Sequence, residues 1–300
     1  MTPSDSAVTG SGSLLSHPFL RQLQRRYPTL SPGFRRLADV VLRDPLDAAF
    51  LSAAELARAA GVSESTVTRF AQALALDGFP GLNGVLQQLV RAHLRTGDRL
   101  LRARAHPPDG YGRAMAEDLA LAQALADHAD EHALGRVVDR IVASRTVFLA
   151  GARSAAALAV YLELYLRMWG KQAEAMTGDP AELDVLGRAG AADLAIVIGF
   201  SRYAAFTVRF AEFAHRRQIP VVAITDHPGS PLARHAQEVL IAPSQVSDAI
   251  ESLVAAMMLV QALVRGTAQR LPPANVDEVK ALEPLWDAFG VYAPGTGRLE

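Results

Sequence analysis

Two short helical patterns joined by a glycine turn occupy residues 52–74, and they constrain the fold more than any other part of the chain. Ser52 and Glu55 have the spacing of a capping box, in which each side chain bonds to the backbone of the other residue. Gly61 suits a left-handed turn, and Ser63 suits the N-cap of a second helix. This is the spacing of a helix-turn-helix, whose second helix fits the major groove of DNA.

The second helix of this unit is predicted to have two unlike faces. Val67, Phe70, Ala71 and Leu74 recur at i, i+3, i+4 and i+7, which is the pattern of a core face. At about 100° per residue, the polar side chains point the other way. Their hydroxyl, guanidinium and amide groups are the types that read base edges and phosphates. The residues predicted to bind DNA are Ser63, Ser65, Thr66, Thr68, Arg69 and Gln72.

Supporting helices are predicted on both sides of the pair. Ser31 and Pro32 suit an N-cap and a first-turn proline, and Pro45 ends the helix that they begin. An amphipathic helix follows the pair, with Leu82, Val85, Leu86 and Leu89 on one side. Upstream, Arg21, Arg25 and Arg26 either contact phosphates beside the groove or form a solvated helix surface. The alternative for the whole unit is an ordinary helical hairpin with a solvated polar face.

The rest of the chain alternates short apolar runs with helical stretches. The predicted strands lie at 146–150, 172–176, 194–198, 221–225 and 238–241. Strands that alternate with helices predict a parallel sheet covered by helices on both faces. The expected fold is therefore an all-α N-terminal helix-turn-helix domain followed by an α/β domain.

These patterns divide the chain into consecutive parts. A polar stretch bearing proline and glycine, between about 95 and 112, is predicted to join the two domains. The apolar run from 249 to 264 is too short to span a bilayer, and it predicts either a buried helix or a subunit contact. The expected boundaries are a disordered tail at 1–16, a DNA-binding domain at 17–95, a linker at 96–111, an α/β domain at 112–275, and a C-terminal helix and tail at 276–300.

Three segments follow predicted strands and lead toward helix N-termini, at 151–154, 199–203 and 225–230. Ligands of open parallel sheets bind at the carboxyl ends of the strands, and helix N-termini favour anions. Arg153 and Arg202 offer planar donor forks for phosphate or carboxylate, and Tyr203 can stack on a ring. The alternative is that Arg202 pairs with a local acid and the pocket is vestigial. The residues predicted to bind a ligand are Gly151, Arg153, Ser154, Ser201, Arg202, Tyr203, Thr225, Asp226 and Ser230.

Across residues 20–270 the chain resembles the RpiR family of bacterial regulators, which join a helix-turn-helix to a SIS (sugar isomerase) domain. The motifs that carry the resemblance are Glu55-Leu56-Ala57, Gly61-Val62-Ser63, Thr66-Val67-Thr68-Arg69-Phe70, Leu76-Asp77-Gly78-Phe79, Gly151-Ala152-Arg153-Ser154, Ala223-Ile224-Thr225-Asp226 and Ser230-Pro231-Leu232-Ala233. The resemblance implies a SIS-like sheet and a phosphorylated sugar as effector. Of the family's Ser-x-Ser-Gly-x-Thr phosphate pattern, the stretch at 199–204 keeps only Ser201.

Composition and absent motifs argue against several classes of enzyme. The chain has no cysteine and a net charge of −1, and it contains neither a phosphate loop for ATP nor a dinucleotide fingerprint. We expect no cofactor, no metal and no catalytic residue. His128 and His132 have metal-ligand spacing, but no further ligand set is evident, and a polar turn that joins two helices explains them. The histidines and glutamates of the α/β part, which are candidate bases, show no acid–base pairing in sequence.

The predicted function is that of a cytoplasmic transcriptional regulator. Its expected partners are a double-stranded DNA operator, a small anionic effector and further copies of the chain, which would form a homodimer or homotetramer. A membrane is not an expected partner. One alternative is a sugar-phosphate isomerase that uses the N-terminal helices as a scaffold. The other is an oligomerisation module with a vestigial pocket.

Overall fold

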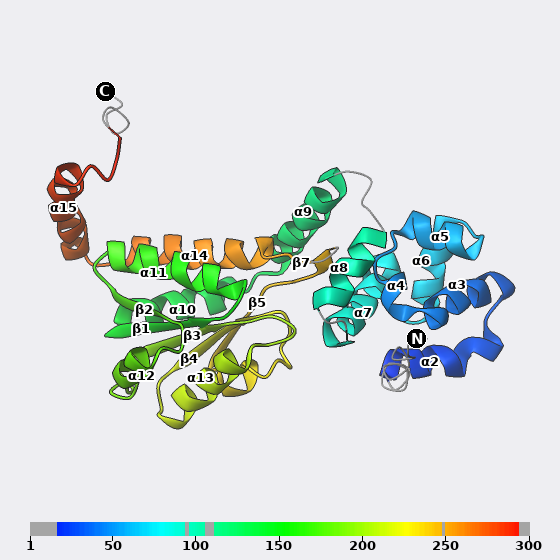
Figure 1. Ribbon diagram of the computed structural model, residues 1–300, viewed down its shortest axis with the longest axis horizontal. Coiled ribbons are helices and arrows are strands. Elements are labelled where there is room, and N and C mark those ends of the chain that lie inside the picture. The colour runs from blue at the N-terminus through cyan, green and yellow to red at the C-terminus, as the bar shows by residue number, and fades with distance from the viewer. Residues whose placement is uncertain (1–16, 94–95, 106–110, 248–249, 294–300) are drawn as a thin grey trace, which may run out of the picture. The chain divides into compact units, whose positions relative to one another are not determined.

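The computed structural model describes residues 17–93, 96–105, 111–247 and 250–293. It divides into two compact units (Figure 1). The first unit extends to Glu117 and includes residues 245–252, and the second contains residues 118–244 and the chain from Leu253 onward. The tail expected at 1–16 lies outside the described residues.

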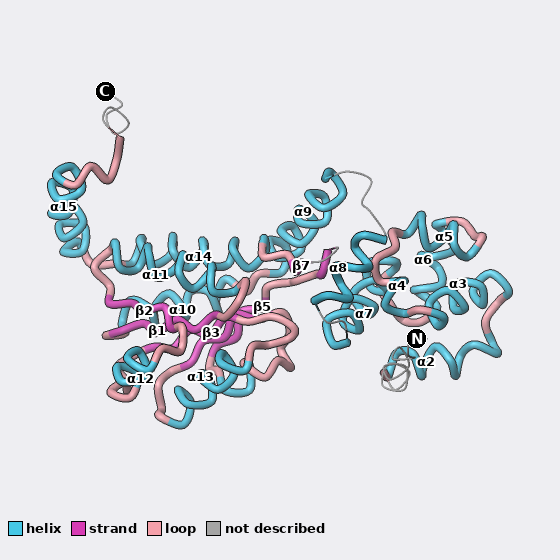
Figure 2. The backbone as a smooth tube through the Cα atoms, viewed as in Figure 1, coloured by secondary structure: helices cyan, strands magenta, loops and turns pink. Residues whose placement is uncertain are grey.

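Apart from one short strand pair, the first unit is helical (Figure 2). Its helices are α2 (Pro18–Arg26), α3 (Pro32–Arg43), α4 (Pro45–Ala48), α5 (Ala53–Ala60), α6 (Glu64–Ala73), α7 (Gly78–His93), α8 (Thr96–Ala105) and the start of α9 (Tyr111–His128), with a 3-10 turn at Tyr27–Thr29 and the antiparallel pair β6 (Val246–Ser247) and β7 (Ile250–Glu251). Leu37, Leu56, Phe70 and Leu86 are fully buried where the apolar helix faces meet. This unit therefore has a hydrophobic core of its own.

Helix boundaries in the first unit follow the predicted capping residues. The Ser52 hydroxyl accepts from the Glu55 amide, and the Glu55 carboxylate accepts from the Ser52 amide at 2.7 Å, which confirms the capping box. Helix α5 ends at Ala60 and is followed by Gly61, whose φ of 60° confirms the left-handed turn. The Ser31 hydroxyl accepts from the Phe34 amide and starts α3. The capping box and Gly61 thus fix the two ends of α5, and Ser31 fixes the start of α3.

The second unit is built on a five-stranded parallel sheet in the order β2-β1-β3-β4-β5. Its strands are β1 (Thr146–Gly151), β2 (Gln172–Met176), β3 (Leu194–Ile198), β4 (Val221–Thr225) and β5 (Glu238–Ile241). Its helices are the end of α9, α10 (Glu131–Ala143), α11 (Ala155–Met168), α12 (Pro180–Leu186), α13 (Ala205–Arg216), α14 (Val254–Arg270) and α15 (Pro273–Ala288), with a 3-10 turn at Ala233–His235. All five predicted strands are confirmed.

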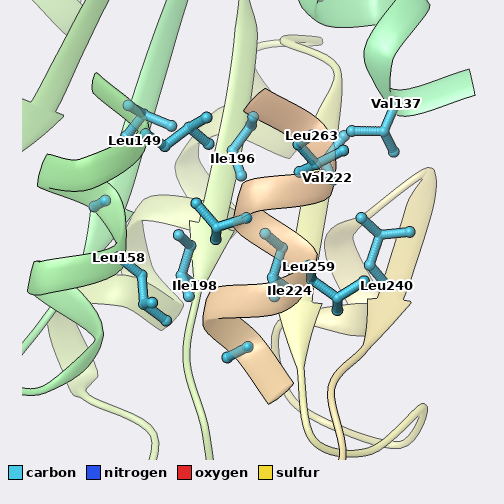
Figure 3. Packing of buried hydrophobic residues seen from close by; sticks show 14 of the residues in the cluster. Val137, Leu149, Leu158, Ile196, Ile198, Val222, Ile224, Leu240, Leu259 and Leu263 are labelled. Carbon is cyan, nitrogen blue, oxygen red and sulfur yellow. The ribbon is translucent and has the colours of Figure 1, made fainter. Parts of the chain in front are cut away.

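Successive strand residues enter different cores on the two faces of the sheet. Leu149 and Ile196 pack with α10, α11 and α14, as Figure 3 shows for the labelled residues. Phe148 and Val197 pack with α12 and α13 on the other face. Side chains alternate along a strand, so a sheet covered on both sides needs apolar residues at every position. The expected α/β architecture with helices on both faces is confirmed.

The linker segment and the C-terminal helix differ from their expected boundaries. Helix α8 occupies residues 96–105, while residues 106–110 lie outside the described part. Asp98 in its first turn and the arginine, leucine and alanine residues that follow favour a helix over the glycine-bearing turn that we expected. The two units separate between Glu117 and Asp118, within α9. Helix α15 begins at Pro273 rather than 276, because proline suits a first turn.

The apolar run expected as either a buried helix or a subunit contact forms most of α14. Leu259, Val260 and Leu263 are buried against α10 and α11 of the same chain. This burial supports the first alternative for the described part of the run, which excludes residues 248 and 249. Among the helices of the described residues, none has the length and apolar character required to cross a membrane.

Candidate nucleic-acid interface and effector site

Helix α6 separates its apolar and polar residues as the sequence predicts. Val67, Phe70 and Ala71 are fully buried, and the ring of Phe70 lies edge-on to Phe34 with centroids 5.6 Å apart. The opposite side chains form what we call the recognition face. Its members are Ser63, Ser65, Thr68, Arg69 and Gln72, which are exposed, and Thr66, which is partly buried.

Side chains of the recognition face bond to one another and to their own helix. The Ser63 hydroxyl lies 2.9 Å from that of Ser65 and 2.8 Å from that of Thr66. Arg69 donates from Nε to the Ser65 carbonyl and from Nη2 to the Thr66 hydroxyl, both at 3.4 Å. Ser63 occupies the N-cap position as expected, but its hydroxyl makes no capping bond to the α6 backbone. The three hydroxyl groups and Arg69 are therefore organised together at the start of α6.

The starts of two other helices lie beside α6. A Cβ atom on Gly33, in the first turn of α3, would lie 3.8 Å from the Cγ2 of Thr66. A Cβ atom on Gly78, which begins α7 with a φ of 58°, would lie 3.5 Å from the Cγ2 of Thr68. The free amides of a helix start favour phosphate oxygens. The recognition face is thus flanked by the starts of α3 and α7.

Three arginines hold this region together through contacts distant in sequence. Arg26, which we considered for phosphate binding, donates to the Ala73 carbonyl at the end of α6 at 2.5 Å. Arg36 donates to the carbonyls of Ala60 and Gly61 and so caps α5. Sequence reasoning missed Arg36 because a cap that comes from a different helix leaves no local pattern.

The third arginine, Arg113 in α9, bonds to the capping box. It donates to the Glu55 carboxylate at 3.2 Å and to the Phe50 carbonyl at 3.1 Å. Burial alone would raise the pKa of Glu55, but hydrogen bonds from Ser52 and the charge and hydrogen bond of Arg113 outweigh it and lower that pKa. The carboxylate that caps α5 is therefore held in its charged form.

In the second unit, the strand register brings the three predicted loops to one edge of the sheet. Gly151 pairs with Ile198, and Ile198 pairs with Ile224, so β1, β3 and β4 end at the same level. The strand order reverses between β1 and β3, which is where sheets of this kind bind ligands. We call the loops at 151–154, 199–203 and 225–230 the strand-end cluster.

The loop after β1 has little space and a strained backbone. A Cβ atom on Gly151 would lie 2.5 Å from the Ala155 carbonyl oxygen, so only glycine fits there. Arg153 has a φ of 58°, which is unusual for a residue with a side chain, and both Arg153 and Ser154 are exposed. The turn therefore presents a guanidinium and a hydroxyl at the start of α11.

The loops after β3 and β4 are joined through Asp226. Its carboxylate accepts from the Ser201 amide at 3.2 Å, from the Tyr203 hydroxyl at 2.6 Å and from the Thr225 hydroxyl at 3.4 Å. Arg202 between them is exposed and has a φ of 68°. Two predicted ligand residues of these two loops are instead buried, Thr225 with 0% and Ser230 with 3% of its surface exposed. The Ser230 hydroxyl accepts from the Ala233 amide and so supports the 3-10 turn.

The candidate bases each contact a neighbour of their own chain. His227 accepts from the Gly229 amide at 2.9 Å, and the rings of His215 and His235 lie against each other. Glu212 pairs with Arg216, and Glu238 binds Arg136. At the turn with metal-ligand spacing, Asp130 caps α10 and His128 bonds to the Ala124 carbonyl. The described residues contain no group of three or more histidine or acidic side chains that could hold a metal ion.

Comparison with known proteins identifies both units. The family model for the rpiR-family helix-turn-helix domain matches residues 18–92, and that for the SIS domain matches residues 140–265. The HTH-type transcriptional regulator HexR of Pseudomonas aeruginosa is 27% identical over 216 residues, which cover 72% of this chain and 75% of HexR. HexR of Escherichia coli is 26% identical over 223 residues, with the same coverage of each chain.

Solved structures show the same fold. The Vibrio vulnificus NanR protein, complexed with ManNAc-6P, matches 92% of this chain and 99% of its own, with a TM-score of 0.55 and 22% identity. The sugar isomerase domain of an RpiR transcription factor from Sphaerobacter thermophilus matches 57% of this chain and 97% of its own, with a TM-score of 0.55 and 25% identity. The chain therefore belongs to the RpiR family of helix-turn-helix transcriptional regulators and carries a SIS domain.

Proposed function

We propose that this regulator binds a double-stranded DNA operator through the recognition face of α6, and that a small anionic metabolite bound at the strand-end cluster controls this binding. One observation carries the DNA-binding part. Helix α6 buries Val67 and Phe70 completely while Arg69 and Gln72 stand exposed on the other side. A helix that is anchored by one face and polar on the other has the form required to enter a major groove.

The class of effector follows from the charges and hydroxyl groups of the strand-end cluster. Arg153 and Arg202 bring two guanidinium groups to this edge, and guanidinium groups bind phosphate and carboxylate well. Ser201 adds a hydroxyl group suited to bond to a sugar, and Tyr203 adds a ring suited to stack on one. NanR, which has this fold, is described with ManNAc-6P bound. A sugar phosphate or a related anion is the effector class that these features support.

The proposed assembly has at least two copies of the chain, as a homodimer or homotetramer. Helix-turn-helix regulators bind two half-sites about one helical turn apart, and matching symmetry requires paired recognition helices. The effector then acts by favouring one spacing of these helices over another, which requires unequal affinity for the two arrangements. The operators of bacterial regulators lie in the cytoplasm, so the cytoplasm is the location that goes with the proposed function.

The proposed function includes no catalytic turnover. The curated relatives named above are transcriptional regulators. Among the candidate bases, Glu238 is bound by Arg136 at 3.0 Å, and His227 accepts a hydrogen bond within its own turn. Glu238 is therefore held in an ion pair, and His227, which lies within the strand-end cluster, uses one ring nitrogen to support its own turn.

The proposal is tested in two steps with the full-length protein. Genomic fragments enriched by the purified regulator define an operator, and gel shifts at several salt concentrations measure its affinity, which falls with salt if phosphates are contacted. A panel of phosphorylated sugars is then added. We expect at least one of them to change operator affinity severalfold. Enrichment of no sequence would contradict the DNA-binding proposal, and a flat response to every anion would contradict the effector proposal.

Arginine variants locate the effector site. Arg202→Ala should abolish the response to the effector while operator binding remains. The matched control is Arg216→Ala at the far end of α13, where the arginine forms only an exposed i,i+4 pair with Glu212. A normal response in Arg202→Ala would move the site away from the strand-end cluster.

A further inference from the structure

The strand-end cluster already holds an anion, which is the carboxylate of Asp226. Its oxygens accept hydrogen bonds from the Ser201 amide and from the hydroxyl groups of Tyr203 and Thr225, at 2.6–3.4 Å. Amide and hydroxyl donors of this kind are those that a bound phosphate would use. Asp226 follows β4 directly, so the sheet itself holds the carboxylate in place.

The same contacts hold the loop after β3 in an unusual backbone conformation. Arg202 has a φ of 68° and lies between the two residues that bond to Asp226. Non-glycine residues keep such a conformation only where surrounding contacts impose it. The bonds from Ser201 and Tyr203 therefore tie the loop to β4 on both sides of the strained residue.

We propose that Asp226 is an internal competitor that sets the specificity of the effector site. This inference rests on the proposed function, because it concerns the same anion site. An incoming anion must displace the carboxylate from the Ser201 amide and the Tyr203 hydroxyl, and it meets a like charge nearby. A simple anion therefore binds weakly. An effector that also carries hydroxyl groups gives the displaced carboxylate new donors and binds better.

Inorganic phosphate is the probe that tests this competition by calorimetric titration of the full-length protein. Asp226→Asn removes the charge but keeps the shape and an acceptor oxygen, and it should tighten phosphate binding about tenfold or more. The matched control is Asp184→Asn, an exposed acid of α12, which changes the net charge equally and should alter phosphate binding less than about twofold. Phosphate affinity that is unchanged or weaker in Asp226→Asn would overturn the proposal.

A second measurement needs no ligand. Amide hydrogen exchange in a peptide covering 199–205 should be faster in Asp226→Ala than in the wild type, because the acceptor of the Ser201 amide is lost. Equal exchange rates would overturn the tie between the loops. If instead the strand-end cluster is not an anion site at all, neither the wild type nor Asp226→Asn would bind phosphate. Exchange at 199–205 would still become faster in Asp226→Ala, so the two failures can be told apart.

Discussion

The recognition face and the strand-end cluster both gather polar side chains, but their partners differ. On α6, Arg69 bonds within its own turn of helix, to the Ser65 carbonyl and the Thr66 hydroxyl. At the strand ends, Asp226 bonds to a loop 25 residues away. The first site is organised by one helix, and the second by the meeting of separate strands. We therefore expect substitutions on the recognition face to change binding without changing stability. Substitutions at the strand ends should change both.

The largest expected effect comes from the inner side of α6. Phe70→Ala should destabilise the first unit by about 3–5 kcal/mol, because it empties a fully buried site and removes the contact with Phe34. Calorimetric unfolding of the full chain should show the transition of that unit lowered. The control is Phe289→Ala, where 79% of the side chain is exposed and the change should stay within about 0.5 kcal/mol. Equal effects would mean that α6 is not anchored as described.

The next largest effect is expected at the strand ends, where one substitution should alter both stability and the effector response. Gly151→Ala should cost about 1–3 kcal/mol, because the new methyl group meets the backbone of Ala155. It should also weaken the effector response, since α11 and the Arg153 turn must move. Gly190→Ala is the matched control, with nothing within 4 Å of its Cβ position. Thermal unfolding and effector titration check both variants, and an unperturbed Gly151→Ala would show that this turn has spare room.

A charged pair joins the starts of β1 and β3, at the opposite edge of the sheet from the strand-end cluster, and so tests the stability of the sheet by itself. Arg145 binds the buried Asp193 carboxylate at 2.7 and 2.9 Å. Burial alone would raise the pKa of Asp193, but the hydrogen bond and charge of Arg145 and the Gly190 and Thr146 amides outweigh it and lower that pKa.

Because the folded-state pKa is depressed, this stabilisation is complete above about pH 4 and is lost as the pH falls through the folded-state value. Asp193→Asn should cost about 1–2 kcal/mol at pH 7, and the cost should shrink below about pH 4. Denaturant unfolding at several pH values measures this difference. A difference that does not change with pH would contradict the depressed pKa.

The smallest changes in stability are expected from substituting two serines at helix starts. Ser52→Ala removes a capping box and should destabilise the first unit by about 1 kcal/mol. Ser63→Ala should change stability by less than about 0.5 kcal/mol, because its hydroxyl bonds only to Ser65 and Thr66. Ser63→Ala should instead weaken operator binding severalfold. Thermal unfolding and gel shifts with both variants check this, and a reversed order of stabilities would refute the assignment of the caps.

Local periodicity made most of the fold predictable. The faces of α6, the glycine turn at Gly61 and the five strands all follow from spacing and residue type within a few neighbouring positions. Helix α12 and the pair β6–β7 were not predicted, because the first has seven residues and each of these strands has two. Such short segments carry too little periodicity to be recognised.

The candidate sites were predictable to different degrees. Which residues of α6 face outward follows from the helix period alone. The contact of Tyr203 with Asp226 spans 23 residues, and that of Arg26 with Ala73 spans 47. Neither leaves a local pattern, because tertiary packing brings the partners together. The sequence therefore places the strand-end cluster but does not show that Asp226 occupies its donors or that Ser230 supports a turn.

Binding of DNA by the outer side of α6 can be tested with one pair of variants. Arg69 and Arg43 are both exposed arginines of the first unit, and Arg43 lies at the end of α3 away from Gly33, the residue beside Thr66. Gel shifts on the selected operator should show affinity lowered about tenfold or more by Arg69→Ala and changed less than about twofold by Arg43→Ala, with unfolding temperatures unaltered. Undiminished binding by a folded Arg69→Ala protein would show that the recognition face is not the DNA-binding surface.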